Sequence, residues 1–238
     1  SRHETYYKPF MTQILINTYN RQSELLALLS QLDTEPLKVS INDDGSDNKM
    51  IFPPYNFLEI EYNYQHGNHG KELYWKTCTN LFKMVDKSYE RFIMLPDDAV
   101  LVPKFLDQAF KQWQAIKHRA IALNILLLKN YKSPNWTGQK PVEMRINKYD
   151  FYLTGWIDGC FICDLRLFEK LEYYVDSISL NRWKRNPLYG SGVGQNMTMR
   201  LNEFGLYHVD KSLVFFKEPS ASQMNPEARK KNPTIAVL

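Results

Sequence analysis

The chain has 238 residues, and its 30 Lys and Arg against 26 Asp and Glu give a net charge of +4 at pH 7 with neutral histidines. This length suits one large α/β domain or two small ones, and it is ample for a hydrophobic core. So small a net charge excludes the strongly basic class of nucleic-acid-binding proteins, and the basic run 229–231 is expected to be a solvated tail. We therefore expect no nucleic-acid partner.

No signal peptide and no apolar run of roughly 18 residues is recognisable, which predicts a cytoplasmic chain with no transmembrane segment. The chain has three cysteines, Cys78, Cys160 and Cys163. The last two form a C-x-x-C, but no second cysteine pair or nearby histidine completes a zinc site. We therefore expect buried, reduced thiols.

Strand and helix patterns alternate along the first half of the chain. Apolar or alternating runs predict strands at residues 13–18, 37–42, 57–62, 91–95 and 120–128. Helical spacing predicts helices at 23–32, 71–85 and 103–117, the first with Ser23 as N-cap and the last with Pro103 in its first turn. This alternation predicts an α/β fold whose central sheet is mostly parallel.

The pattern loosens after about residue 130, in a polar and turn-rich stretch. It resumes with strand patterns at 150–154 and 159–163, and then with a helix that Asp164 would cap. A further helix is predicted at 193–204, with Gly205 at the position after its end. The second half is thus expected to complete the fold begun by the first.

Three of the first four predicted strands end in polar clusters, at residues 17–20, 43–46 and 97–98. In an open parallel sheet, ligands bind outside the carboxyl ends of the strands. Each cluster alone is a common strand ending, but three at one sheet edge indicate a binding site there.

The adjacent acids Asp97 and Asp98 suggest how that site handles phosphate. Neither a G-x-G-x-x-G after a first strand nor a G-x-x-x-x-G-K-[ST] is present, which excludes the dinucleotide and P-loop phosphate cradles. Two carboxylates can instead hold Mg²⁺ or Mn²⁺, which would bind a diphosphate and offset the repulsion between the acids. We expect their positive partner to be this cation rather than a Lys or Arg. The alternative is a helix-capping pair ahead of Pro103.

Three stretches together resemble a known family: ILINTYNRQSELLALLSQL (14–32), VSINDDGSD (39–47) and FIMLPDDAVLVPKFL (92–106). They resemble the nucleotide-sugar glycosyltransferases of the GT-A fold, especially the family-2-like group. The resemblance is clear over roughly 11–110 and fainter to about 216.

This resemblance implies a single Rossmann-like GT-A domain over 1–238, with a mostly parallel sheet of about six or more strands flanked by helices. Residues 11–130 would form the donor-binding half, 131–216 the acceptor-side half and 217–238 a C-terminal tail.

The resemblance also implies roles for individual residues. The donor-binding residues would be Asn17, Thr18, Tyr19, Asp44, Lys71 and Asp97. Among them, Asp44 would bond a uracil base, and Asp97 would face the ribose and the metal shell. Asp98 would be the direct ligand of Mn²⁺ or Mg²⁺, and His208 is a further candidate metal ligand, with a structural histidine as the alternative.

The acceptor side departs from the family pattern. Val193 and Gly194 stand where the family has two acids, the second of which is the catalytic base of inverting enzymes. Asp158 is the alternative candidate base, although it could be a turn residue, and the enzyme could instead retain configuration. Trp156 could stack on an acceptor sugar or pack in the core.

The leading hypothesis is a metal-dependent glycosyltransferase that moves a sugar from a nucleoside diphosphate sugar, a UDP-sugar, to a hydroxyl of a glycan acceptor. The missing acid at Gly194 leaves a catalytically silent nucleotide-sugar-binding module as the alternative. A sugar-phosphate nucleotidyltransferase is disfavoured, because the loop NTYNRQSE is not glycine-rich.

Overall fold

A computed structural model of the chain describes residues 11–127, 140–157, 159–201 and 203–216. Its main sheet has nine strands in the order β3-β2-β1-β4-β9-β6-β10-β8-β7. Four strands from the first half are parallel: β1 (Thr12–Thr18), β2 (Leu37–Asp43), β3 (Leu58–Tyr64) and β4 (Arg91–Pro96). The predicted α/β fold is confirmed.

The second half extends this sheet with mixed pairing. β9 (Phe161–Cys163) runs antiparallel between β4 and β6 (Ala122–Asn124). Next to β6 lies the parallel strand β10 (Leu206–Val209), followed by the hairpin of β8 (Tyr149–Leu153) and β7 (Val142–Ile146). A separate pair joins β5 (Ala99–Leu101) to β11 (Val214–Phe216).

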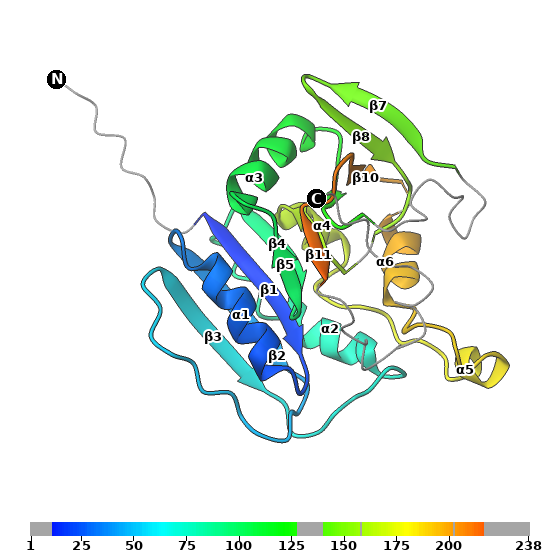
Figure 1. Cartoon of the computed structure of the whole chain (residues 1–238). Coiled ribbons are helices and arrows are strands. Elements are labelled where there is room, and N and C mark those ends of the chain that lie inside the picture. The colour runs from blue at the N-terminus through cyan, green and yellow to red at the C-terminus, as the bar shows by residue number, and fades with distance from the viewer. Residues whose placement is uncertain (1–10, 128–139, 158, 202, 217–238) are drawn as a thin grey trace.

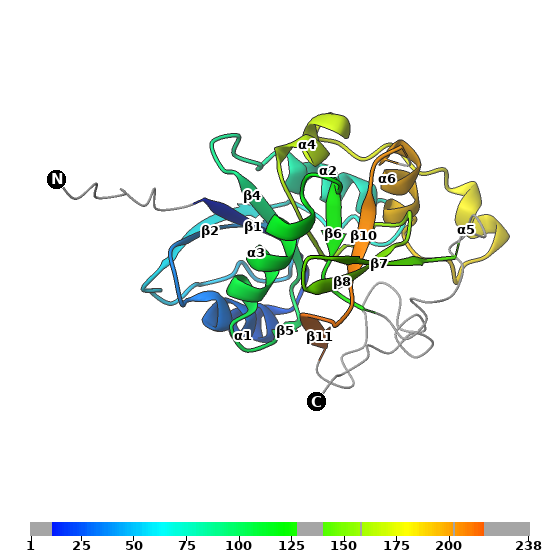
Figure 2. The ribbon, with the colours of Figure 1, turned by 90° about the horizontal axis from the view of Figure 1, so that it is seen from above.

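Helices cover both faces of the main sheet, as Figures 1 and 2 show. One face carries α1 (Gln22–Leu32) and α3 (Phe105–Ile116), and the other carries α2 (Tyr74–Phe82), α4 (Leu165–Lys170) and α6 (Val193–Leu201). The short α5 (Asn181–Arg185) projects at one end.

The alternating direction of the side chains along β1 explains why helices pack on both faces of the sheet. Ile14 and Ile16 pack with α1 and α3, whereas Leu15 packs with α2. Successive side chains of a strand point to opposite faces, so a continuous apolar run feeds both cores.

Several element ends differ from the sequence-based expectation. Arg21, not Ser23, precedes α1, and the Ser23 hydroxyl bonds the Glu24 carboxylate instead. Asp164 caps α4 as predicted, by accepting from the Arg166 backbone N–H at 3.1 Å. The predicted helix 193–204 ends earlier, at Leu201, so Gly205 does not directly follow α6. A Cβ at Gly205 would collide with the Arg119 carbonyl oxygen.

Cys78, Cys160 and Cys163 are all buried, in agreement with the prediction. Burial raises the pKa of the Cys78 thiol to about 12, and it raises that of Cys163 well above its ordinary value. No described helix has the length and apolar character that a membrane-spanning segment needs.

Candidate functional site

The three predicted polar clusters lie side by side. β1 sits between β2 and β4, and Thr18 at its end is level with Asp43 of β2, while Asn17 is level with Pro96 of β4. Because all three strands are parallel, the residues that follow them meet at the carboxyl edge of the sheet. The structure thus brings the polar ends of β1, β2 and β4 together.

Asp97 and Asp98 are both buried at this edge, with exposed fractions of 9% and 6%. The Thr18 hydroxyl donates to an Asp97 oxygen at 2.9 Å. The Arg21 guanidinium contacts the Asp98 carboxylate directly, and its Nη1 lies 3.8 Å from the other Asp97 oxygen. The expectation that no Lys or Arg would neutralise the pair is therefore wrong.

Arg21 is a residue of this site that sequence reasoning missed. It stands between the end of β1 and α1 and is only 8% exposed, so its charge is held inside the site. Its position near the end of β1 was the available signal. A buried guanidinium beside two carboxylates offsets the repulsion that the sequence alone left unexplained.

The fit to a divalent metal depends on this arginine. Within the described residues, no group of three or more His, Cys, Asp and Glu is arranged to hold a metal ion. Two adjacent carboxylates nevertheless match what Mg²⁺ takes from a protein when phosphate and water complete its shell. The donor types at Asp97 and Asp98 fit such an ion, on the condition that Arg21 leaves the Asp98 carboxylate.

His208 is not brought to this pair. It lies on β10, which β9 and β6 separate from β4, a spacing of roughly 14 Å across three strand intervals. The ring is 5% exposed, and its Nδ1 lies 2.9 Å from the Thr154 hydroxyl and 3.3 Å from the Asn124 amide nitrogen. These contacts fix His208 within the second half of the sheet.

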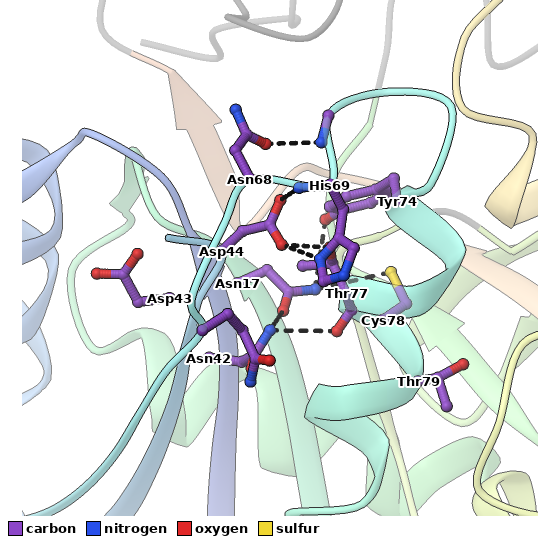
Figure 3. Close-up of polar contacts among 12 residues, drawn as sticks. Asn17, Asn42, Asp43, Asp44, Asn68, His69, Tyr74, Thr77, Cys78 and Thr79 are labelled. Carbon is purple, nitrogen blue, oxygen red and sulfur yellow. Dashed lines mark hydrogen bonds and ion pairs between the residues drawn. The ribbon is translucent and has the colours of Figure 1, made fainter. Parts of the chain in front are cut away.

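Asp44 lies in a separate polar cluster beside α2, shown in Figure 3. One carboxylate oxygen contacts His69 Nδ1 at 2.5 Å and accepts from the Thr77 hydroxyl at 2.8 Å. The other oxygen accepts from the His69 backbone N–H at 3.0 Å. The neighbouring Asp43 instead accepts from the Tyr62 hydroxyl at 2.6 Å, and burial, followed by this bond, raises the pKa of Tyr62 to about 12.

The remaining donor-side candidates have different surroundings. The Asn17 amide nitrogen lies 3.4 Å from the Tyr74 hydroxyl and 3.7 Å from the Cys78 sulfur, so this side chain packs against α2. Tyr19 is half-buried. Lys71 donates to the Pro187 carbonyl at 2.6 Å, beside a cavity of about 330 Å³, and so links the donor half to the loop after α5.

On the acceptor side, Trp156 is half-buried and its carbonyl accepts from the Asn124 amide at 2.9 Å. Its indole lies against Gly194 in α6: a Cβ there would be 3.3 Å from the ring and 2.9 Å from the Ile157 carbonyl oxygen. The backbone therefore leaves no room for an acid at position 194. Asp158, the alternative base, lies outside the described residues.

This contact predicts that Gly194→Ala destabilises the protein, although alanine has a helix propensity about 1 kcal/mol more favourable than that of glycine. The methyl group must push against backbone, and such overpacking costs about 1–3 kcal/mol. We expect a net loss of about 1 kcal/mol in the free energy of unfolding, measured with urea. Gly159→Ala, where nothing lies within 4 Å of the new Cβ, is the control and should change little. Equal stability of both variants would contradict the contact.

No protein-family model matches the chain, and no curated protein matches its sequence. Among solved structures it is similar to S. aureus TarS residues 1–349, with a TM-score of 0.57 and 14% identity, covering 86% of this chain and 60% of that one. The catalytic domain of Drosophila β1,4-galactosyltransferase 7, solved with xylobiose, gives a TM-score of 0.45 and 8% identity, over 84% of this chain and 65% of that one. The chain spans less than two thirds of either.

The likeness to TarS shows the fold: the chain has the GT-A glycosyltransferase fold that its sequence predicted. In this fold the described site lies at the carboxyl ends of β1, β2 and β4.

Proposed function

We propose that the protein is a glycosyltransferase that moves a sugar from a nucleoside diphosphate sugar, a UDP-sugar, to a hydroxyl of a glycan acceptor. The observation that carries the proposal is the convergence of Asp44, Asp97 and Asp98 at one edge of a GT-A sheet. Two clusters of different chemistry lie there. The Asp97–Asp98 pair suits the diphosphate end of a donor, and the hydrogen-bonded cluster around Asp44 beside α2 suits the nucleobase of the donor.

Mn²⁺ or Mg²⁺ belongs to this proposal, with Asp98 as its direct ligand and Asp97 in its shell. When bound, the metal would offset the charge of the diphosphate and act as a Lewis acid on the leaving group. Arg21 would leave the Asp98 carboxylate on metal binding and become available to a phosphate oxygen, for which a guanidinium is well suited. Lys71, in the donor-binding half of the chain, is the second positively charged side chain that we propose to face the donor.

On the acceptor side we propose Asp158 as the base that deprotonates the attacking hydroxyl and Trp156 as the surface for the acceptor sugar. The lack of room for a side chain at Gly194 supports a base from elsewhere. Replacement of Asp158 by Asn should then slow transfer while leaving donor affinity unchanged. The same lack of room also favours a second candidate, a nucleotide-sugar-binding module without turnover.

Metal-dependent donor binding tests the proposal directly. The wild type should bind UDP in the presence of Mn²⁺, and Asp98→Asn should weaken this binding by roughly 100-fold, about 2.7 kcal/mol, measured by calorimetry. Asp107→Asn on the exposed surface of α3 is the matched control and should bind normally. Unchanged affinity in Asp98→Asn would remove Asp98 from the metal site.

Turnover separates the two candidate functions. Incubation of the wild type with Mn²⁺ and a panel of nucleotide sugars should release free nucleoside diphosphate, slowly without an acceptor and faster with one. Metal-dependent binding without release from any donor would favour the binding module.

A further inference from the structure

The Asp44 carboxylate is already engaged inside the protein. Both of its oxygens accept hydrogen bonds, one of them from a backbone N–H and the other within reach of two side chains. The Asp44 side chain is 7% exposed, whereas that of His69 is 23% exposed. The group of this pair that faces outward is therefore the imidazole, not the carboxylate.

The contact with Asp44 determines which nitrogen of the His69 ring carries a proton toward the carboxylate. A carboxylate can only accept, so the nitrogen 2.5 Å from it, Nδ1, carries the proton. In the neutral ring the other nitrogen, Nε2, is then a hydrogen-bond acceptor. Within the described part of the chain, His69 Nε2 has no hydrogen-bonding partner.

Three sets of contacts hold the imidazole in place, and Figure 3 shows those made by side chains. Asp44 binds both its ring and its backbone, and the Thr77 hydroxyl on α2 supports the Asp44 oxygen from the other side. Gly45 packs directly on Gly67, so the loop that carries Asp44 supports the loop that carries His69. A group fixed this way loses little conformational entropy when it binds.

We propose that His69, oriented by Asp44, is the residue that reads the base of the donor, through a hydrogen bond accepted at Nε2. The inference rests on the proposed function. An acceptor selects a base edge that presents a ring N–H, such as uracil N3–H. Cytosine presents an unprotonated ring nitrogen at the same position, and two acceptors facing each other leave a polar group unpaired.

The test compares UDP with CDP on the wild type and His69→Asn. Asparagine keeps an N–H near the position of Nδ1 that can bond Asp44, but it has no counterpart of Nε2. We expect the wild type to bind UDP at least about tenfold more tightly than CDP. In His69→Asn the affinity for UDP should fall by about tenfold and that for CDP should stay the same, so the selectivity disappears. His66→Asn, on the exposed part of the same loop, should keep the wild-type selectivity.

The outcomes separate the possible failures. The assignment is overturned if His69→Asn keeps the wild-type selectivity for UDP over CDP, whether both affinities fall equally or neither falls. That outcome leaves the proposed function intact. A wild type that binds neither nucleotide contradicts the proposed function itself. A measurement on the wild type does not depend on a variant that folds: with labelled protein and labelled UDP, a scalar coupling across the hydrogen bond should join uracil N3 to His69 Nε2. Saturated binding without that coupling overturns the proposal.

Discussion

Replacing Arg21 with methionine is expected to lower the free energy of unfolding in metal-free buffer by about 3–5 kcal/mol. The substitution keeps much of the apolar volume of the side chain but removes the charge that lies against Asp98 and near Asp97. Two adjacent buried carboxylates would then face each other without a cation. Urea unfolding followed by tryptophan fluorescence measures the loss.

The same variant tests the metal site through stability rather than activity. With Arg21 gone, Mn²⁺ would no longer compete with a guanidinium for the Asp98 carboxylate. Mn²⁺ at about 100 times its dissociation constant should restore roughly 2.7 kcal/mol to Arg21→Met, and at the same concentration it should stabilise the wild type less.

Arg145→Met is the matched control for the charge change. Arg145 pairs with Asp150 at 3.5 Å on the surface, with 69% of its side chain exposed, so its removal should cost less than about 1 kcal/mol and Mn²⁺ should change nothing. A destabilised Arg21→Met that does not respond to Mn²⁺ would show that the acids pair with arginine alone.

The fold was predictable where local pattern decides it. Continuous apolar runs such as Ile14 to Ile16 need two covered faces, which only a sheet between helix layers provides. The antiparallel insertion of β9 between β4 and β6 was not predictable, because strand order depends on contacts between residues far apart in the chain. The three-residue strands β5 and β11 are too short for any periodicity to identify.

In the candidate site, too, some residues could be predicted from the sequence and others could not. Asp44, Asp97 and Asp98 could be placed at the sheet edge because each lies within three residues of the end of a predicted strand. Arg21 could not be assigned to the acids, since its backbone belongs to the start of α1 and only the folded chain shows where its side chain turns. His69 meets Asp44 from a loop with no pattern of its own, after β3.

Gly45→Ala is the second substitution with a large expected effect, because two penalties act at one position. Gly45 has a φ of +81°, in the region that L-residues adopt at a cost of about 1–2 kcal/mol. A Cβ would also lie 2.6 Å from the Gly67 carbonyl carbon, so backbone has to move, which costs about 1–3 kcal/mol more. The expected loss in the free energy of unfolding is roughly 2–5 kcal/mol.

Gly70→Ala isolates the first of these penalties. Gly70 has a φ of +60°, but nothing lies within 4 Å of the position that a Cβ would take there, so the loss should be only about 1–2 kcal/mol. The excess loss in Gly45→Ala measures the contact between the Asp44 and His69 loops. Because that contact supports His69, UDP affinity measured well below the unfolding temperature should also fall in Gly45→Ala and less in Gly70→Ala. Equal stability losses in the two variants would mean that the loops yield freely, and the imidazole would then lack the support from which its role is inferred.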